Sequence, residues 1–274
     1  MKKKLIFHFY VVDDWITHPI VSLHLKLLRY YADFFDEAMF VIALNDINDT
    51  TTINEIETML VDIGYHNVEF KVVKNDAILR ESMTFYEFFV KQLGKYDGIL
   101  YFGHIKGVFD ISSLNKKYEN ISHWVCLLYY QTFSKEYYNE ISSNSRSIAC
   151  GANKDITLRD DYKKRLYNGK YDYCYGGTFL GINCPKLIEW AKKTNTVIDV
   201  PFHGINYSEN YISNVIPPEL AFGKWCKHGK NGLDNYHYLE ATFDALNKSE
   251  INKFKDFYKK IHEEKEISVS FLCD

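Results

Sequence analysis

The chain has 274 residues, of which 46% are hydrophobic and 25% charged, and its 33 Lys and Arg nearly balance its 36 Asp and Glu. This composition is typical of a globular protein and excludes disordered, collagen-like and disulfide-scaffold classes. The net charge of -3 also argues against non-specific binding of nucleic acid, which depends on neutralising phosphates.

The first hundred residues alternate short apolar runs with helical patterns. Strands are expected at Leu5–Val12, Met39–Leu44, Val68–Val73 and Ile99–Phe102, with helices between them at His18–Phe35, Ile53–Ile63 and Ser82–Leu93. Glycine follows two of these helices, at Gly64 and Gly94. The alternation predicts βαβ units, and therefore an α/β fold with a mostly parallel central sheet covered by helices on both faces.

The regular alternation of strand and helix patterns ends at about residue 107. The patterns predict a helix at Asn120–Ile141, a strand at Ser147–Gly151, an apolar run at Tyr173–Ile182 and a helix at Pro185–Lys193. Residues 195–232 are expected to be irregular, and Leu233–Glu264 to form two closing helices. The aromatic side chains of Trp124, Tyr129 and Tyr130 are expected in the core first and as sugar-stacking groups second. The simplest organisation is one domain over residues 1–274, with an elaborated C-terminal half.

The cysteines and the apolar start bear on the compartment. None of the six cysteines forms a CxxC pair, a pattern typical of scattered reduced thiols. The apolar run Leu5–Val12 ends at two aspartates and lacks a cleavage site, so we interpret it as a buried strand. No apolar run approaches 18 residues. We expect a cytoplasmic protein, with peripheral association at the inner face of a membrane as the alternative.

Polar residues follow the predicted strands, and parallel sheets place ligands at the carboxyl ends of their strands. His8 and Tyr10 lie in the first strand, Asn45 and Asp46 follow the second, Arg80 lies beyond the third, and His104, Lys106 and Gly107 follow the fourth. We expect these residues to converge on one cleft. The structural alternatives are a core role for His8 and Tyr10, an ordinary turn at Asn45 and Asp46, and a surface position for Arg80 and Lys106.

Several common motifs are missing. The sequence has no GxGxxG after the first strand, no GxxxxGK[ST] and no GxSxG. A dinucleotide fingerprint, a P-loop NTPase and a nucleophile-elbow hydrolase are therefore not indicated.

One segment is similar to a known family. Residues 96–102, YDGILYF, run into Gly103-His104-Ile105-Lys106-Gly107. This layout resembles a GT-A-type nucleotide-sugar glycosyltransferase of the bacterial polysaccharide type, with a YxHxKG-like signature where the DxD motif of that fold would stand. Residues 175–183, YGGTFLGIN, resemble the small-residue turn and strand of the acceptor side, and Glu219 after two prolines fits the family plan. The resemblance covers roughly residues 4–225.

The resemblance implies a separate role for each of three parts of the chain. Residues 1–107 would bind the nucleotide, 108–232 would form the acceptor side, and 233–274 would add C-terminal helices. His8, Tyr10, Asn45, Asp46, Arg80, His104, Lys106 and Gly107 would bind a nucleotide-diphosphate sugar donor. Gly176, Gly177 and Thr178 would contact a glycan or lipid-linked glycan acceptor. Glu219 would be the catalytic base, with Asp110, Asp161 and Asp172 as rivals.

The departure from the family lies in the metal motif. No D-x-D occurs in the sequence, so no metal site and no cofactor are predicted, and Mn²⁺ stays as the alternative. A departing nucleoside diphosphate gains negative charge, which a metal ion or fixed cationic side chains must stabilise. Lys106 supplies an ammonium group, His104 a hydrogen-bond donor, and Gly107 an amide that can approach a phosphate closely.

The sequence therefore predicts a metal-independent glycosyltransferase that acts on a glycan hydroxyl, with inversion slightly preferred. Three alternatives stay open from the residues. The first is a sugar-nucleotide-binding protein of the same fold without turnover, which the missing DxD favours. The second is an α/β transferase of phosphoryl or acyl groups. The third is a structural or partner-binding domain, in which Lys106 would have no role in ligand binding.

Overall fold

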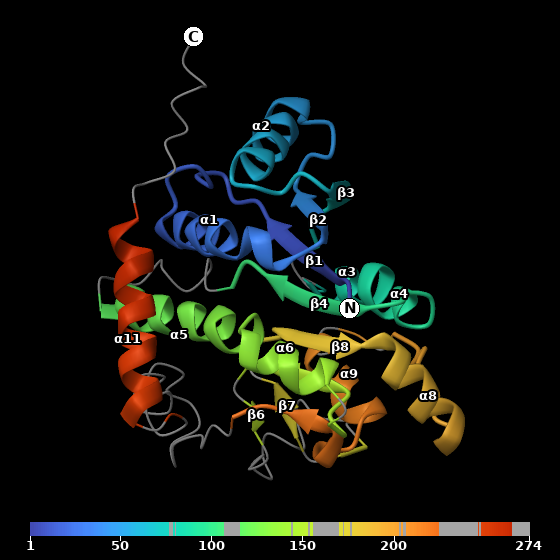
Figure 1. The fold of residues 1–274 in the computed structure, drawn as a ribbon. Coiled ribbons are helices and arrows are strands. Elements are labelled where there is room, and N and C mark those ends of the chain that lie inside the picture. The colour runs from blue at the N-terminus through green and yellow to red at the C-terminus, as the bar shows by residue number, and fades with distance from the viewer. Residues whose placement is uncertain are drawn as a thin grey trace.

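The computed structural model is an α/β fold built around a mixed sheet with helices on both faces (Figure 1). It describes residues 1–76, 79, 81–106, 116–143, 145–152, 154–155, 170–171, 173–175, 177–202, 204, 207–224, 246 and 248–264. Over these ranges the main sheet has seven strands, in the order β3-β2-β1-β4-β8-β5-β9.

The sheet takes strands from both halves of the chain. They are β1 (Lys3–Tyr10), β2 (Glu37–Leu44), β3 (Val68–Lys74), β4 (Ile99–His104), β5 (Ala149–Gly151), β8 (Leu180–Asn183) and β9 (Ala221–Phe222). β8 pairs antiparallel with both β4 and β5, and the other pairings are parallel. The chain therefore enters β8 at the edge where β1 to β4 end. The short strands β6 (Lys154–Asp155) and β7 (Cys174–Tyr175) form a separate antiparallel pair.

Helices cover both faces of the sheet. One face packs against α1 (Pro19–Tyr31), α2 (Thr50–Asp62), α5 (Lys116–Thr132), α6 (Lys135–Ser142) and α11 (Lys248–Glu263). The other packs against α3 (Glu81–Thr84), the π-helix η2 (Phe85–Val90), α4 (Lys91–Leu93), α8 (Cys184–Thr194) and α9 (Tyr207–Val215). Short 3₁₀ turns lie at η1 (Ala32–Phe34) and η4 (Pro218–Leu220).

Alternation along the central strands produces two separate cores. In β1, Leu5, Phe7 and Phe9 face α1 and α5, whereas Ile6 faces the helical segment 81–93. These side chains are fully buried, and each contributes about 1.5 to 3 kcal/mol by burial. The same period of two turns His8 toward the side of Ile6, because successive strand residues point to opposite faces. Alternation thus places a polar group on the face that carries α3.

The structure confirms the α/β fold and differs from the sequence prediction in three elements. The predicted helix 120–141 is two helices, because the Ser134 side chain accepts a hydrogen bond from Tyr137 N (3.2 Å) and caps a new start. The predicted helix 82–93 contains the π segment η2. The stretch 195–232 is not irregular throughout, since Tyr207, Tyr211 and Val215 form the buried face of α9. Of the closing helices, α11 is present and residues 233–245 lie outside the described ranges.

Candidate functional site

His8 and His104 lie side by side at the carboxyl edge of the sheet. They are partners in the parallel β1–β4 register, and they are 4% and 3% exposed, respectively. His104 Nε2 lies 2.9 Å from the Gly177 carbonyl oxygen, so this nitrogen carries the hydrogen and donates it. The contact joins the end of β4 to the turn that enters β8.

The helical segment that follows β3 adds two polar side chains to the histidine pair. Thr84 Oγ1 lies 2.9 Å from His8 Nδ1. Glu81 Oε1 lies 4.0 Å from His104 Nε2, and the Glu81 side chain is only 14% exposed. A largely buried carboxylate is costly without compensating charge. The cluster of His8, Glu81, Thr84 and His104 is named the edge cluster below.

Charge and burial act in opposite directions on the edge cluster. Burial alone would raise the pKa of Glu81, but the positive charges of His104 and Lys106 help to lower it to about 2. Burial lowers the pKa of His8 to about 4, despite the opposing effect of the Glu81 carboxylate. At neutral pH the edge cluster therefore holds an ionised carboxylate beside a neutral His8.

Lys106 lies two residues beyond the end of β4, with its side chain half-buried. Its Nζ is 5.4 Å from the centre of the Trp124 ring of α5, a cation–π contact. Among the described residues, no carboxylate lies within ion-pair distance of this ammonium group. Its charge nevertheless acts on Glu81. Lys106 is thus an ammonium group at the carboxyl edge of the sheet, in contact with an aromatic ring.

The turn into β8 has unusual backbone geometry. Gly177 has φ +80°, a conformation that favours glycine, and a Cβ there would lie 3.0 Å from a methyl carbon of Leu128, which is a tight contact. Thr178 also has a left-handed φ of 55°, which is rare for a β-branched residue. Its buried Oγ1 has no hydrogen-bond partner within the described ranges. Strain of this kind is concentrated at functional sites in proteins.

The predicted donor-binding residues nearer the outer strands form a second polar group. Asn75 Nδ2 lies 3.2 Å from Tyr10 Oη and 2.9 Å from Asn45 Oδ1, which connects the ends of β1, β2 and β3. Asp46 is exposed, and its Oδ1 accepts a hydrogen bond from Asn48 N (2.9 Å), an ordinary turn contact. Tyr10 and Asn45 therefore share this edge with His8, while Asp46 shapes a turn.

Several predicted residues lie outside the described ranges. They are Arg80, Gly107, Gly176 and the rival bases Asp110, Asp161 and Asp172.

The sequence predicts Glu219 as the catalytic base, and the structure places it away from the edge cluster. Glu219 precedes β9, so it lies toward the amino end of a strand that runs parallel to β4. Three strand spacings, about 14 Å, separate β9 from β4 across the sheet. Glu219 is exposed, and its charge acts on the Lys154 ammonium group. We therefore leave it out of the candidate site.

Sequence reasoning missed Glu81, Thr84 and His24. Glu81 follows Arg80, which the strand-end argument had reached, so extending that argument by one residue would have found it. Thr84 and His24 lie within helical patterns, where nothing local in the sequence marks a polar residue as part of a site. Their partners are distant in sequence: Thr84 contacts His8, and His24 contacts Lys106.

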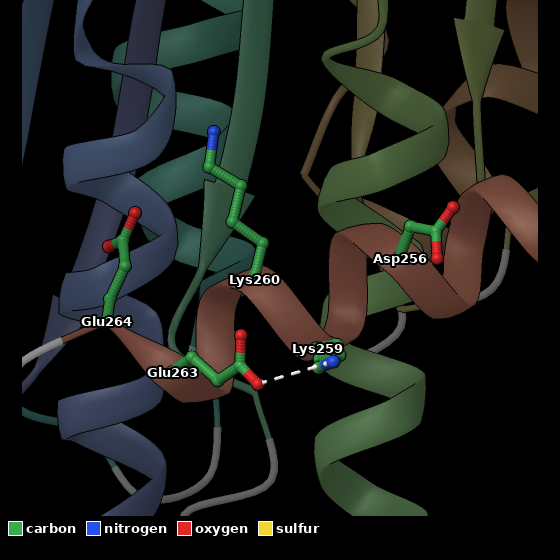
Figure 2. Close-up of a pocket in the computed structure, with 5 residues that line it drawn as sticks. All are labelled: Asp256, Lys259, Lys260, Glu263 and Glu264. Atoms are coloured by element: carbon green, nitrogen blue, oxygen red, sulfur yellow. Dashed lines mark ion pairs between the residues drawn. The ribbon is translucent and has the colours of Figure 1, made fainter.

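A surface depression lies elsewhere, on α11. Figure 2 shows that charged side chains line it: Asp256, Lys259, Lys260, Glu263 and Glu264. Lys259 Nζ pairs with Glu263 Oε1 at 3.6 Å, and Lys260 Nζ lies 4.6 Å from the centre of the Tyr30 ring. These pairs within and beside one helix are ordinary for an exposed face, so the depression takes no part in the candidate site.

Three further findings complete the description. Across the described residues, no group of three His, Cys, Asp or Glu side chains is arranged to hold a metal ion. In the same ranges, every helix is too short or too polar to cross a bilayer. Comparison with known proteins finds no family model and no curated protein that matches this chain.

Proposed function

We propose that this chain is a glycosyltransferase that moves a sugar from a nucleoside diphosphate donor to a hydroxyl group of a glycan acceptor in the cytoplasm. The observation that carries the proposal is the meeting of Lys106 with the edge cluster at the carboxyl ends of β1 and β4. Parallel α/β sheets bind ligands at that edge. Lys106 brings an ammonium group without a carboxylate in contact among the described residues.

The reaction breaks the bond between the anomeric carbon and a diphosphate oxygen, and forms a bond between that carbon and the acceptor oxygen. Negative charge collects on the departing diphosphate. Lys106 would stabilise this charge as a fixed cation. When its ring is protonated, His104 would donate a second hydrogen bond to the diphosphate from the ring nitrogen that does not bond Gly177. The Glu81 carboxylate lies 4.0 Å from the other nitrogen of this ring. The acceptor hydroxyl gives up its proton to solvent water as the new bond forms, because Glu219 lies away from this edge of the sheet.

The turn at Gly177 and Thr178 supports an acceptor or sugar position beside this charge. The Gly177 carbonyl oxygen accepts a hydrogen bond from His104 Nε2. The Thr178 hydroxyl is buried without a hydrogen-bond partner among the described residues. A buried hydroxyl in this condition is costly, and a ligand hydroxyl would satisfy it.

Calorimetry with UDP, GDP, dTDP and coenzyme A tests the class of ligand. We expect one of the nucleoside diphosphates to bind and coenzyme A not to bind. Lys106→Met should weaken the binding by about 10- to 100-fold, since a hydrogen bond to a charged group contributes about 1.5 to 3 kcal/mol. Lys224→Met is the matched control: it removes a lysine that pairs with Glu250 and Glu136, away from the edge cluster.

Turnover is tested with the matching nucleotide sugar in the presence of EDTA. Release of the nucleoside diphosphate under these conditions supports transfer by fixed side chains. Binding without release, with or without added Mn²⁺, would favour the sugar-nucleotide-binding alternative. Tight binding of coenzyme A alone would reject the proposed function.

A further inference from the structure

His24 of α1 lies on the opposite side of Lys106 from the edge cluster, and it is fully buried. Its Nε2 is 3.0 Å from the Lys106 amide nitrogen and 3.1 Å from the Lys106 carbonyl oxygen. Its Nδ1 is 2.9 Å from Tyr129 Oη of α5. One imidazole therefore connects the main chain of Lys106 to two helices.

Both neutral forms of the imidazole hold the Lys106 main chain. With the hydrogen on Nδ1, that nitrogen donates to Tyr129 Oη, and Nε2 accepts from the Lys106 amide. With the hydrogen on Nε2, it donates to the Lys106 carbonyl, and Nδ1 accepts from the Tyr129 hydroxyl. Burial lowers the pKa of His24 to about 3, so a neutral form is present throughout the physiological range.

The position of this contact matters because the sheet ladder ends here. Ile105 N donates to the His8 carbonyl oxygen at 3.1 Å, which among the described residues is the last main-chain hydrogen bond between β1 and the segment after β4. Lys106 is the next residue, and its main chain is held by hydrogen bonds with the His24 side chain instead of by the sheet. The lysine side chain then ends over Trp124, which is on the same helix as Tyr129. α1 and α5 thus fix both the main chain and the ammonium group of Lys106.

We infer that His24 is a positioning residue that holds Lys106 in place for an anionic ligand. The inference rests on the proposed function, in which the Lys106 ammonium group binds a diphosphate. It predicts that the affinity for pyrophosphate depends on a hydrogen-bonding group at residue 24, although this group does not touch the ligand.

The test is calorimetry of the full chain with inorganic pyrophosphate. His24→Met replaces the imidazole with an apolar side chain of similar size and so removes the hydrogen bonds, and we expect about tenfold weaker binding. His24→Gln retains a donor and an acceptor, and should bind within about threefold of wild type. Urea unfolding of both variants measures their stability, so that a loss of folded protein is not taken for a loss of affinity.

A matched pair of tyrosines provides a second measurement. Tyr129→Phe removes the hydroxyl that fixes His24, whereas Tyr65→Phe removes a buried hydroxyl that donates to the Leu28 carbonyl of the same helix α1 at 3.0 Å. Both changes delete one buried hydrogen bond to α1. We expect Tyr129→Phe to weaken pyrophosphate binding by about fivefold and Tyr65→Phe to leave it unchanged.

The outcomes separate the inference from the proposed function. If wild type binds pyrophosphate, Lys106→Met does not, and His24→Met binds like wild type, the positioning role is overturned and the proposed function stands. If the two folded variants at residue 24 lose affinity equally, the hydrogen bonds do not explain the effect, and the inference is again rejected. If wild type binds neither pyrophosphate nor any nucleoside diphosphate, the proposed function fails as well.

Discussion

Glu81 and Glu219 are two carboxylates that the fold places in opposite environments. Glu81 is largely buried 4.0 Å from His104, and Glu219 is exposed before β9. Glu81→Gln should lower the transfer rate by about tenfold or more, because a neutral amide replaces the buried carboxylate that faces His104 and interacts with the Lys106 charge. Steady-state rates at neutral pH measure the effect.

Glu219→Gln is the control for that change. We expect its rate to stay within about twofold of wild type, as for other exposed substitutions away from a site. A larger loss in Glu219→Gln than in Glu81→Gln would contradict the placement of the site at the carboxyl edge of β4.

The candidate site is partly predictable from sequence at the residue scale. His104 and Lys106 follow a short apolar strand directly, so the rule that ligands bind at strand ends finds them. Glu81 and His24 reach the same place from helices, through contacts with residues 23 and 82 positions away in the chain. No periodicity encodes such contacts, because they depend on how the helices dock on the sheet.

At the scale of elements, the pairing of β4 with β8 depends on a missing side chain. Gly181 lies opposite Tyr101 in this antiparallel pair, and a Cβ at Gly181 would lie 2.6 Å from a ring carbon of Tyr101. Gly181→Ala should lower the free energy of unfolding by about 2 to 3 kcal/mol, because the buried ring must move within a packed core. Urea unfolding followed by circular dichroism measures the change.

Gly94→Ala is the matched glycine. A Cβ at Gly94 would have no atom within 4 Å, and its φ of -80° suits alanine. We expect its free energy of unfolding to be unchanged or to rise by about 0.5 kcal/mol. Equal destabilisation by the two substitutions would show that the close contact with Tyr101 does not limit the β4–β8 pair.

The first half of the fold is more predictable than the second. β1 to β4 and their helices are long enough for clear apolar periods, and the sequence prediction finds each of them. β5, β8 and β9 have two to four residues each, too few to establish a period or a direction. The antiparallel direction of β8 in particular follows from its partners in the sheet, not from its own residues.

At the scale of the whole molecule, buried histidines govern the response to acid. Burial lowers the pKa of His8 to about 4 and that of His24 to about 3, from an ordinary value of 6.5. The unfolded chain therefore binds more protons than the folded protein as the pH falls below 6.5, and stability is lost in that direction. Each histidine should reduce the free energy of unfolding by about 2 kcal/mol between pH 7 and pH 5.

Urea unfolding at pH 7, 6 and 5 checks this pH dependence. His24→Gln should lose about half of it, since only His8 of the pair remains. An identical pH dependence in wild type and His24→Gln would mean that His24 is not held neutral in the folded protein.

The reversed direction of β8 also affects the order in which the molecule can be completed during synthesis. His104 meets its acceptor at Gly177, which the ribosome adds 73 residues later. A nascent chain that ends soon after β4 has the histidines, Glu81 and Lys106, but lacks both the turn that orients His104 and the helix that carries Trp124. Ligand-binding competence should therefore arise late in translation, after the N-terminal strands have already paired.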